Sequence, residues 1–353
     1  MSELFRPLTL RGVTLPNRVW VAPMCQYSSV DGVPTDWHLV HLGGLARGGA
    51  GLVIAEATAV TPEGRISPRD AGIWTDEQAA AYRRINAFIT EQGSVPGIQL
   101  AHAGRKASAY VPWQGRGSVP VAEGGWPTVG PSPVAFAGYA TPAELSVDEI
   151  AVIVRQWSEA AVRAVAAGFR VVEVHAAHGY LLHEFLSPVS NRRGDGYGGD
   201  LVGRSRLLVE VVDVVRAALP DEVALFVRVS ATDWVPGGLD VDEVAEVARV
   251  LAGHGVDLVD VSSGGNAAEQ HITPEPGYQV PFARAIREHS GLPVGAVGLI
   301  TEPRHAQKIL AEGSADAVLL GRALLREPTW PQRAAAELGA DLPWPPQYAT
   351  ARR

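Results

Sequence analysis

The stretch that decides the fold is Phe169-Arg170-Val171-Val172-Glu173-Val174-His175-Ala176-Ala177-His178-Gly179-Tyr180. Its first half is a short, mostly apolar run of the kind that forms a buried strand. Two imidazoles and a phenol follow at the point where that strand should end. Three proton-active groups at one strand end indicate the floor of a reaction site.

The same pattern of apolar strand, loop and amphipathic helix recurs along the chain. Eight strands are predicted, at Val19–Met24, Gly51–Ala57, Gly97–Ala101, Arg170–His175, Leu225–Val229, Leu258–Ser262, Val294–Gly298 and Ala317–Gly321. Helices are predicted at Asp36–Arg47, Asp76–Gln92, Val147–Ala167, Arg204–Ala218, Val241–Gly253, Val280–His289, Pro303–Glu312 and Thr329–Leu338. Most of the strands are continuously apolar, as parallel strands covered on both faces should be.

Eight such units predict an α/β protein with a (β/α)8 TIM barrel, forming a single domain over residues 1–353. A doubly wound open sheet is the alternative, but Pro23–Tyr27 follows the first strand where that fold carries a glycine-rich phosphate turn. Residues 1–16 predict an N-terminal hairpin, and residues 339–353 form a C-terminal tail. The long segments 103–145 and 187–203 should cover the carboxyl-terminal mouth of the barrel. Ser146 with Glu149 forms a capping box, and Thr301 is expected to cap the helix that begins at Pro303.

Composition narrows the functional classes. The 353 residues carry a net charge of −8, which favours neither nucleic acid nor an anionic membrane as a partner. The single cysteine, Cys25, excludes an intramolecular disulfide and a cysteine-ligated metal cluster. We find no apolar signal core at the N-terminus and no apolar run of about 18 residues, so a cytoplasmic location is expected.

The strand ends supply the candidate site. Small residues end the last three strands beside one cation, which predicts an anion cradle made by Ser262, Gly298, Gly321 and Arg322. Arg228 lies on an apolar strand and should point into the barrel mouth, although an ion pair with Glu173 or Asp260 would also account for it. Each residue has a plainer interpretation too. Cys25 could be a small core residue, Gln99 could bind a backbone group, and Gly321-Arg322 could simply begin a helix.

Taken together, these residues resemble the Old Yellow Enzyme family of FMN-dependent ene-reductases, in particular its shorter, thermophilic-like branch with a cysteine near the flavin. The resemblance runs from Leu4 to Tyr348. The motifs that carry it are Asn17-Arg18, Ala22–Tyr27, Gly64–Ser67, Gln99–Ala107, His175–Leu181, Asn191–Arg193 with Asp195–Gly199, and Gly321-Arg322.

The resemblance implies an NADPH-driven enzyme that reduces activated C=C bonds in enones, maleimides and nitro compounds, with NADPH preferred over NADH. It implies a homodimer or homotetramer. The residues implied to hold FMN are Pro23, Met24, Cys25, Ala57, Gln99, Arg228, Ser262, Gly298, Gly321 and Arg322. Tyr180 is implied to donate a proton, while His175 and His178 bind the substrate carbonyl. Tyr27, Ile66 and Lys106 are implied to line the substrate side.

Two positions depart from the family pattern. In part of the branch the tail reads Gln-Tyr-x-Arg, and that Arg enters the site of a neighbouring subunit. Here Thr350 stands at the corresponding position, and Arg352 is the nearest cation. Some relatives also have a tryptophan where this chain has Val297, so a roomier space above the flavin is expected.

Three alternatives stay open at this point. A metal-dependent hydrolase could use His102, His175 and His178 as zinc ligands. A dienoyl-CoA reductase relative would need iron–sulfur cysteines and extra domains. A non-catalytic flavin-binding protein would hold FMN that NADPH does not reduce.

Overall fold

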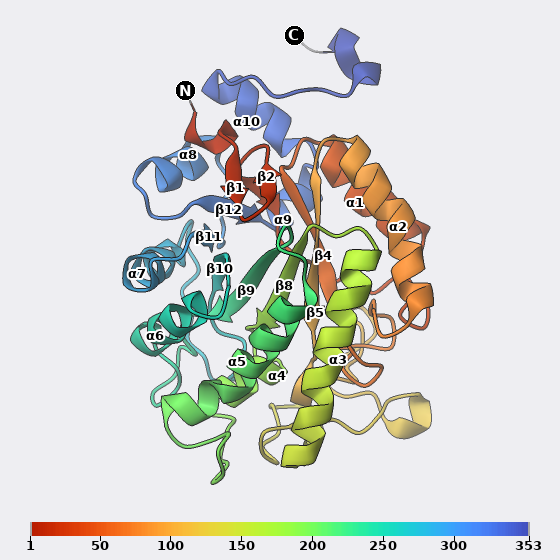
Figure 1. Ribbon diagram of the computed structural model, residues 1–353, viewed down its shortest axis with the longest axis vertical. Helices are drawn as coiled ribbons and strands as arrows, with labels where there is room; N and C mark the ends of the chain where they lie inside the picture. Colours follow the sequence, from red (N-terminus) through yellow and green to blue (C-terminus); the bar gives the residue numbers. More distant parts are fainter. Residues whose placement is uncertain (1, 352–353) are drawn as a thin grey trace.

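Eight parallel strands close into a barrel in this computed structural model, which describes residues 2–351 (Figure 1). Around the barrel they follow chain order and the last pairs with the first: β3 (Val19–Val21), β4 (Leu52–Ala59), β5 (Val95–Ala101), β8 (Val171–Ala176), β9 (Ala224–Ser230), β10 (Leu258–Ser262), β11 (Val294–Ala296) and β12 (Ala317–Leu320). The predicted (β/α)8 barrel is therefore confirmed. Within residues 2–351 we find no helix with the length and apolar character to cross a membrane.

Helices cover the outside of the barrel. The long ones are α1 (Asp36–Arg47), α2 (Asp76–Glu91), α3 (Val147–Ala166), α5 (Leu201–Ala218), α6 (Val241–Ala252), α7 (Val280–Ser290), α8 (Pro303–Ala311) and α10 (Trp330–Leu338). On α3, Ile150 and Trp157 are buried, and the capping box at its start is present. Ser146 N donates to Glu149 Oε2 at 2.8 Å. The expected Thr301 cap is wrong: Glu302 precedes α8 without a side-chain cap, and Thr301 instead accepts a bond from Trp330 Nε1 through its carbonyl.

The amino-terminal end of the barrel is closed by a hairpin of β1 (Leu8–Leu10) and β2 (Val13–Leu15). Its apolar side chains pack with the lowest interior layer, where Trp20 and Phe226 stack with ring centroids 5.8 Å apart. The described residues of this cluster are all apolar, so the barrel floor is packed with apolar side chains.

The mouth lies at the opposite end from the chain termini, beneath the long βα segments (Figure 1). Segment 103–145 contains η2 (Gly104–Lys106), η3 (Val121–Glu123) and the short paired strands β6 (Val129–Gly130) and β7 (Ala143–Glu144). Arg193 fastens it, because Nη1 donates to Leu145 O at 2.6 Å and to Pro131 O at 3.1 Å. The loops expected over the mouth are thus held to one another by buried hydrogen bonds.

Several boundaries differ from the prediction for identifiable reasons. β3 ends at Val21, three residues early, because Pro23 has no N–H to donate to a neighbouring strand. β11 ends before Gly298, whose φ of 124° lies outside the strand region. The short helix α4 (Leu181–Leu186) was not predicted, since so few residues show no helical period. The short helix α9 (Arg322–Arg326) begins at Arg322, as the plainer interpretation of Gly321-Arg322 expected. The remaining 3-10 turns are η1 (Glu3–Phe5) and η4 (Pro346–Ala351), and Arg352 lies outside the described residues.

Candidate functional site

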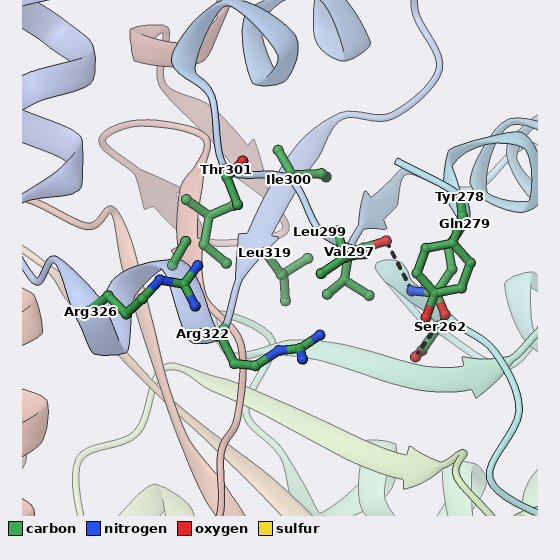
Figure 2. Close-up of a pocket in the computed structure, with 14 residues that line it drawn as sticks. Ser262, Tyr278, Gln279, Val297, Leu299, Ile300, Thr301, Leu319, Arg322 and Arg326 are labelled. Atoms are coloured by element: carbon green, nitrogen blue, oxygen red, sulfur yellow. Dashed lines mark hydrogen bonds between the residues drawn. The ribbon is translucent and has the colours of Figure 1, made fainter. Parts of the chain in front are cut away.

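A cavity of about 240 Å³ opens where β10, β11 and β12 end. The four residues predicted to form an anion cradle, Ser262, Gly298, Gly321 and Arg322, all line it. Figure 2 shows Arg322 extending from the end of β12 toward Ser262, with Arg326 beside it on α9. Neither guanidinium forms an ion pair with a carboxylate among the residues that the structure describes. The cavity therefore holds two uncompensated cations, which suits a phosphate group.

A β-carbon could not be added at Gly298 without displacing its neighbours. It would lie 2.9 Å from Gln279 Nε2 and 3.2 Å from the Tyr278 ring, at a φ that side chains rarely adopt. Gln279 also donates to Val297 O at 3.0 Å (Figure 2) and accepts from Ser263 Oγ at 2.6 Å. Glycine at position 298 thus allows the backbone to lie against the cavity, and the hydrogen bond from Gln279 to Val297 O holds that backbone in position.

The loop after β3 lines the neighbouring wall and is held by the buried carboxylate of Glu56. Glu56 accepts from Gln26 N at 2.9 Å and from His38 Nε2 at 2.9 Å. A β-bulge between Ala55 and Ala57 turns this carboxylate outward and aligns Ala57 with Gln99 of β5. Desolvation, followed by the charges of Asp70 and Glu56, raises the pKa of the Cys25 thiol well above its usual value, so the thiol stays protonated.

Gln99 and Arg228 reach the barrel interior together with two carboxyl groups. Gln99 Nε2 donates to Glu173 Oε1 at 2.7 Å, and Arg228 Nε lies 3.0 Å from Asp260 Oδ2. The ion-pair interpretation of Arg228 is therefore confirmed, with Asp260 rather than Glu173 as the partner. The register places Arg228 beside His175 on the next strand, one layer above Glu173.

His175 and His178 are neighbours, but their ring nitrogens are engaged differently. Their ring centroids lie 5.3 Å apart, and burial lowers both pKa values well below 6.5, so both imidazoles are neutral at pH 7. His175 Nδ1 accepts from Ala177 N at 3.3 Å, which leaves the proton on Nε2. His178 Nε2 instead lies 2.7 Å from Ser262 Oγ. His175 is therefore the imidazole with a free N–H donor.

Tyr180 lies against His175, with ring centroids 5.0 Å apart. Burial raises the pKa of this phenol well above 10, and nearby Cys25 and Tyr27 raise it further. Tyr180 therefore keeps its proton at neutral pH. A protonated phenol beside a neutral N–H donor can deliver a proton next to the atom that accepts the hydrogen bond.

Lys106, predicted to line the substrate side, has its ammonium group occupied by the protein. Nζ donates to His178 O at 2.7 Å and to Gly265 O at 2.9 Å, and it lies 5.0 Å from the Tyr180 ring centroid. Burial lowers its pKa to about 8. His178 has a φ of 60°, so its turn needs such support. The geometry makes Lys106 a residue that positions the His178–Tyr180 turn.

This position yields a prediction for Lys106→Met, which keeps the chain length but removes both hydrogen bonds. We expect turnover to fall by roughly tenfold, because charged hydrogen bonds contribute about 1.5–3 kcal/mol and about 1.4 kcal/mol corresponds to tenfold in rate. Lys308→Met is the matched control, since Lys308 is on the exposed face of α8. Steady-state kinetics of both variants test the prediction, and equal turnover in the two variants would contradict it.

The remaining substrate-side candidates lie on two loops. Tyr27 packs edge-on against the exposed Trp113 of segment 103–145, with ring centroids 5.7 Å apart. Ile66 is held through its backbone, since Ile66 N donates to Asp70 Oδ2 at 3.2 Å and Ala109 N donates to Ile66 O at 2.7 Å. Both Tyr27 and Ile66 are half-buried on these loops.

Sequence reasoning missed several residues that support the site. His38, Arg326, Gln279, His183 and Asp233 were not singled out. His183 Nδ1 accepts from Gly179 N at 2.9 Å, and its Nε2 lies 3.0 Å from Asp233 Oδ1. The sequence did offer one signal for His183, which is a third histidine close after the His-x-x-His-Gly-Tyr stretch. Their partners come from distant segments, which spacing along the chain does not reveal.

Buried carboxyl groups predict how stability depends on pH. Burial raises the pKa values of Asp70, Glu173 and Glu184 to about 8 each, so the folded state keeps protons that the unfolded chain releases near about pH 4. The folded state then binds more protons, and the free energy of unfolding must fall as pH rises toward 8. Below about pH 6.5 the buried histidines oppose this trend, because their pKa values are lowered.

We therefore expect the urea midpoint to decrease from about pH 6.5 to about pH 8. Glu184→Gln should reduce that decrease, because it removes one of the carboxyl groups that must ionise. Urea unfolding of both proteins across this range is the measurement. A midpoint that is constant or rises with pH would show that these groups are ionised in the folded protein.

Comparison with known proteins shows the family of the chain. Residues 3–341 match the model of the "NADH:flavin oxidoreductase / NADH oxidase family". The chain is 46% identical to the NADPH dehydrogenase of Geobacillus thermodenitrificans (strain NG80-2), over 98% of both chains. Morphinone reductase superposes with a TM-score of 0.80 at 31% identity, covering 98% of this chain and 92% of that one. The old yellow enzyme homologue of Zymomonas mobilis gives 0.79 at 28% identity, covering 99% of each chain.

Among residues 2–351 we find no group of three histidine, cysteine or acidic side chains placed to hold a metal ion. The site contains two phosphate-suited arginines, the buried Gln99 and Arg228, each beside a buried acid, and a neutral imidazole donor. An enzyme that carries out flavin-dependent oxidoreduction with a nicotinamide donor fits these features and the sequence matches. The chain belongs to the NADH:flavin oxidoreductase / NADH oxidase family and is a member of its Old Yellow Enzyme group.

Proposed function

We propose that this enzyme uses FMN and NADPH to reduce activated C=C bonds in enones and maleimides, and that nitro compounds are also accepted. The observation that carries the proposal is the free Nε2–H of neutral His175, which lies beside the protonated Tyr180 at the barrel mouth. When bound, FMN supplies the hydride transfer between NADPH and the substrate. The preference for NADPH over NADH is supported by the names of relatives such as that of Geobacillus thermodenitrificans.

The chain's own residues fit an FMN molecule along the barrel mouth. Arg322, with Arg326, would hold the phosphate, and Gln99 and Arg228 would contact the electron-rich edge of the flavin ring. Arg228 Nε lies 3.0 Å from Asp260 Oδ2, but this ion pair lacks hydrogen-bond geometry, and Gln99 is buried with Arg228. The residues proposed to surround the remaining surface of the ring and its chain are Pro23, Met24, Cys25, Ala57, Ser262, Gly298 and Gly321.

The substrate carbonyl would accept a hydrogen bond from His175 Nε2–H, with His178 beside it. As a hydride reaches the β-carbon of an enone, negative charge develops on that oxygen, and a preorganised N–H donor stabilises it. Tyr180 would then protonate the α-carbon. Neutral imidazoles suit this role, because a donor that keeps its proton does not compete with Tyr180 as the acid.

The substrate side is proposed to be shaped by Tyr27 and Ile66, while Lys106 acts through the His178–Tyr180 turn. We also propose a cytoplasmic location and a homodimer or homotetramer. Tyr348 of the tail is hydrogen-bonded to Arg47 of the same chain at 2.7 Å, and Thr350 is exposed. Light scattering of the purified protein tests the oligomeric state.

Phosphate binding gives a direct prediction for Arg322→Met. Charge-assisted hydrogen bonds contribute about 1.5–3 kcal/mol, so the Kd for FMN should rise by about 10- to 100-fold. The Kd for riboflavin, which lacks the phosphate, should change little. Fluorescence titration of the flavin-free protein measures both constants, and Arg304→Met on the exposed face of α8 is the control. An equal loss for both ligands would place Arg322 away from the phosphate.

Turnover with a panel of acceptors tests the proposed function itself. Under anaerobic conditions, NADPH should reduce the bound flavin faster than NADH, and cyclohexenone and N-methylmaleimide should reoxidise it. A protein that binds FMN but is not reduced by either nucleotide would be a flavin-binding protein without this activity. Reduction without reoxidation by any enone or maleimide would leave the oxidoreductase assignment but sink the proposed substrate class.

A further inference from the structure

Two buried carboxyl groups lie in the barrel interior on the two strands that flank the strand of Arg228. Glu173 and Asp260 are both 0% exposed, and they come from β8 and β10 on either side of β9, which carries Arg228. Asp260 Oδ2 lies 3.0 Å from Arg228 Nε, and Glu173 Oε1 accepts from Gln99 Nε2 at 2.7 Å. One cation therefore faces two acids in a region without bulk water.

The surroundings supply no further positive charge. The layer below is apolar and contains Trp20, Val171 and Phe226. His175 lies above and is held neutral, while the carboxylate of β4, Glu56, turns outward to His38. Glu173 Oε2 and Asp260 Oδ1 have no hydrogen-bond partner among the described residues. Two ionised carboxylates here would leave one negative charge uncompensated.

Burying an uncompensated charge is costly, so the pair should hold a proton. The pKa of Glu173 is raised to about 8 by burial and by the charge of Asp260, and Arg228 partly opposes this shift. Burial raises the pKa of Asp260 as well, although Arg228 lowers it. The two acids interact, so they titrate as a pair rather than as independent groups.

We propose that Glu173 and Asp260 form one proton-binding site that takes up a proton when the flavin is reduced and releases it on reoxidation. The proposal rests on the proposed function, in which the electron-rich edge of the flavin lies against Gln99 and Arg228. Hydride transfer from NADPH brings two electrons and one hydrogen and leaves a negative charge at that edge. Before reduction, one ionised carboxylate of the pair balances the charge of Arg228. After reduction, the negative flavin balances Arg228 instead, and that carboxylate takes up a proton from solvent.

Proton counting during reduction tests the proposal on the FMN-loaded enzyme. The enzyme is reduced anaerobically with NADPH in weakly buffered solution at about pH 7.5 with an indicator dye. Wild-type protein should take up close to one proton more per flavin than the double variant Glu173→Gln/Asp260→Asn, in which neither side chain can bind the proton. Glu184→Gln is the matched control, since Glu184 on α4 is an equally buried acid that accepts a hydrogen bond from Arg105 N. It should behave as wild type.

Equal proton uptake in wild type and the double variant Glu173→Gln/Asp260→Asn would overturn the proposal, as would a loss of the extra proton in Glu184→Gln. If the double variant does not fold or bind FMN, the pH dependence of the wild-type flavin potential decides. Each proton in a two-electron couple contributes ~30 mV per tenfold change in proton concentration. From about pH 7 to about pH 8 the slope should correspond to two protons, and a slope of one proton contradicts the proposal.

These outcomes are separable from failure of the proposed function. Wild-type protein that binds no flavin, or whose flavin NADPH does not reduce, would refute that function. Flavin that is reduced normally without the extra proton would refute only the shared proton site.

Discussion

His175→Ala should slow enone reduction by roughly 10²–10³-fold, the usual effect of removing one preorganised donor to a developing oxyanion. The reductive half-reaction with NADPH should change little, because the carbonyl of the enone is not present in that step. Binding of a phenol that mimics the enolate should weaken as well. Stopped-flow kinetics of the two half-reactions separate these effects.

The two imidazoles should not contribute equally. His178 Nε2 already has Ser262 Oγ as a partner at 2.7 Å, whereas His175 Nε2–H is free. We therefore expect His178→Ala to cost less than His175→Ala. His175→Asn, which restores an N–H donor, should recover part of the rate. Unchanged oxidative kinetics in His175→Ala would refute the oxyanion role.

Tyr180→Phe should slow the oxidative half-reaction by about 10²–10⁴-fold, the usual contribution of a positioned general acid. Phenylalanine keeps the ring that packs on His175 and Lys106, so the turn should stay in place. Flavin reduction by NADPH should be nearly unaffected. If the reductive half-reaction were the slower one in this variant, Tyr180 would not be the proton donor.

The barrel was predictable because its strands are separately readable in the sequence. The Leu258–Ser262 strand and the Asp36–Arg47 helix match the structure residue for residue. Errors occurred where one residue overrides a local pattern, as at Pro23, or where a helix is too short to show a period, as at Leu181–Leu186. Hydrophobic periodicity therefore conveys the architecture better than it conveys the strand ends where the site lies.

The sequence predicted which residues form the candidate site better than it predicted the hydrogen bonds between them. Residues at the ends of neighbouring strands had to lie near one another, so the grouping of Ser262, Gly298 and Arg322 followed from the fold. The role of Lys106 did not, because its acceptors are the carbonyls of His178 and Gly265, each more than 70 residues away along the chain. Carbonyl acceptors leave no mark in a sequence.

The difference in hydrogen bonding between His175 and His178 could not be predicted either, because it also depends on partners that are distant along the chain. It depends on which ring nitrogen finds a partner, and Ser262 comes from a different strand than His178. Bonds of this kind between strands decide which groups remain free for a ligand.

The destination of the hydride tests the central claim most directly. NADPH carrying deuterium at its transferable position would be supplied with cyclohexenone in ordinary water, and the saturated ketone analysed by NMR. We predict that deuterium appears at the β-carbon and solvent hydrogen at the α-carbon. A ketone with deuterium elsewhere, or no saturated ketone although the bound flavin is reduced, would contradict the proposed reaction.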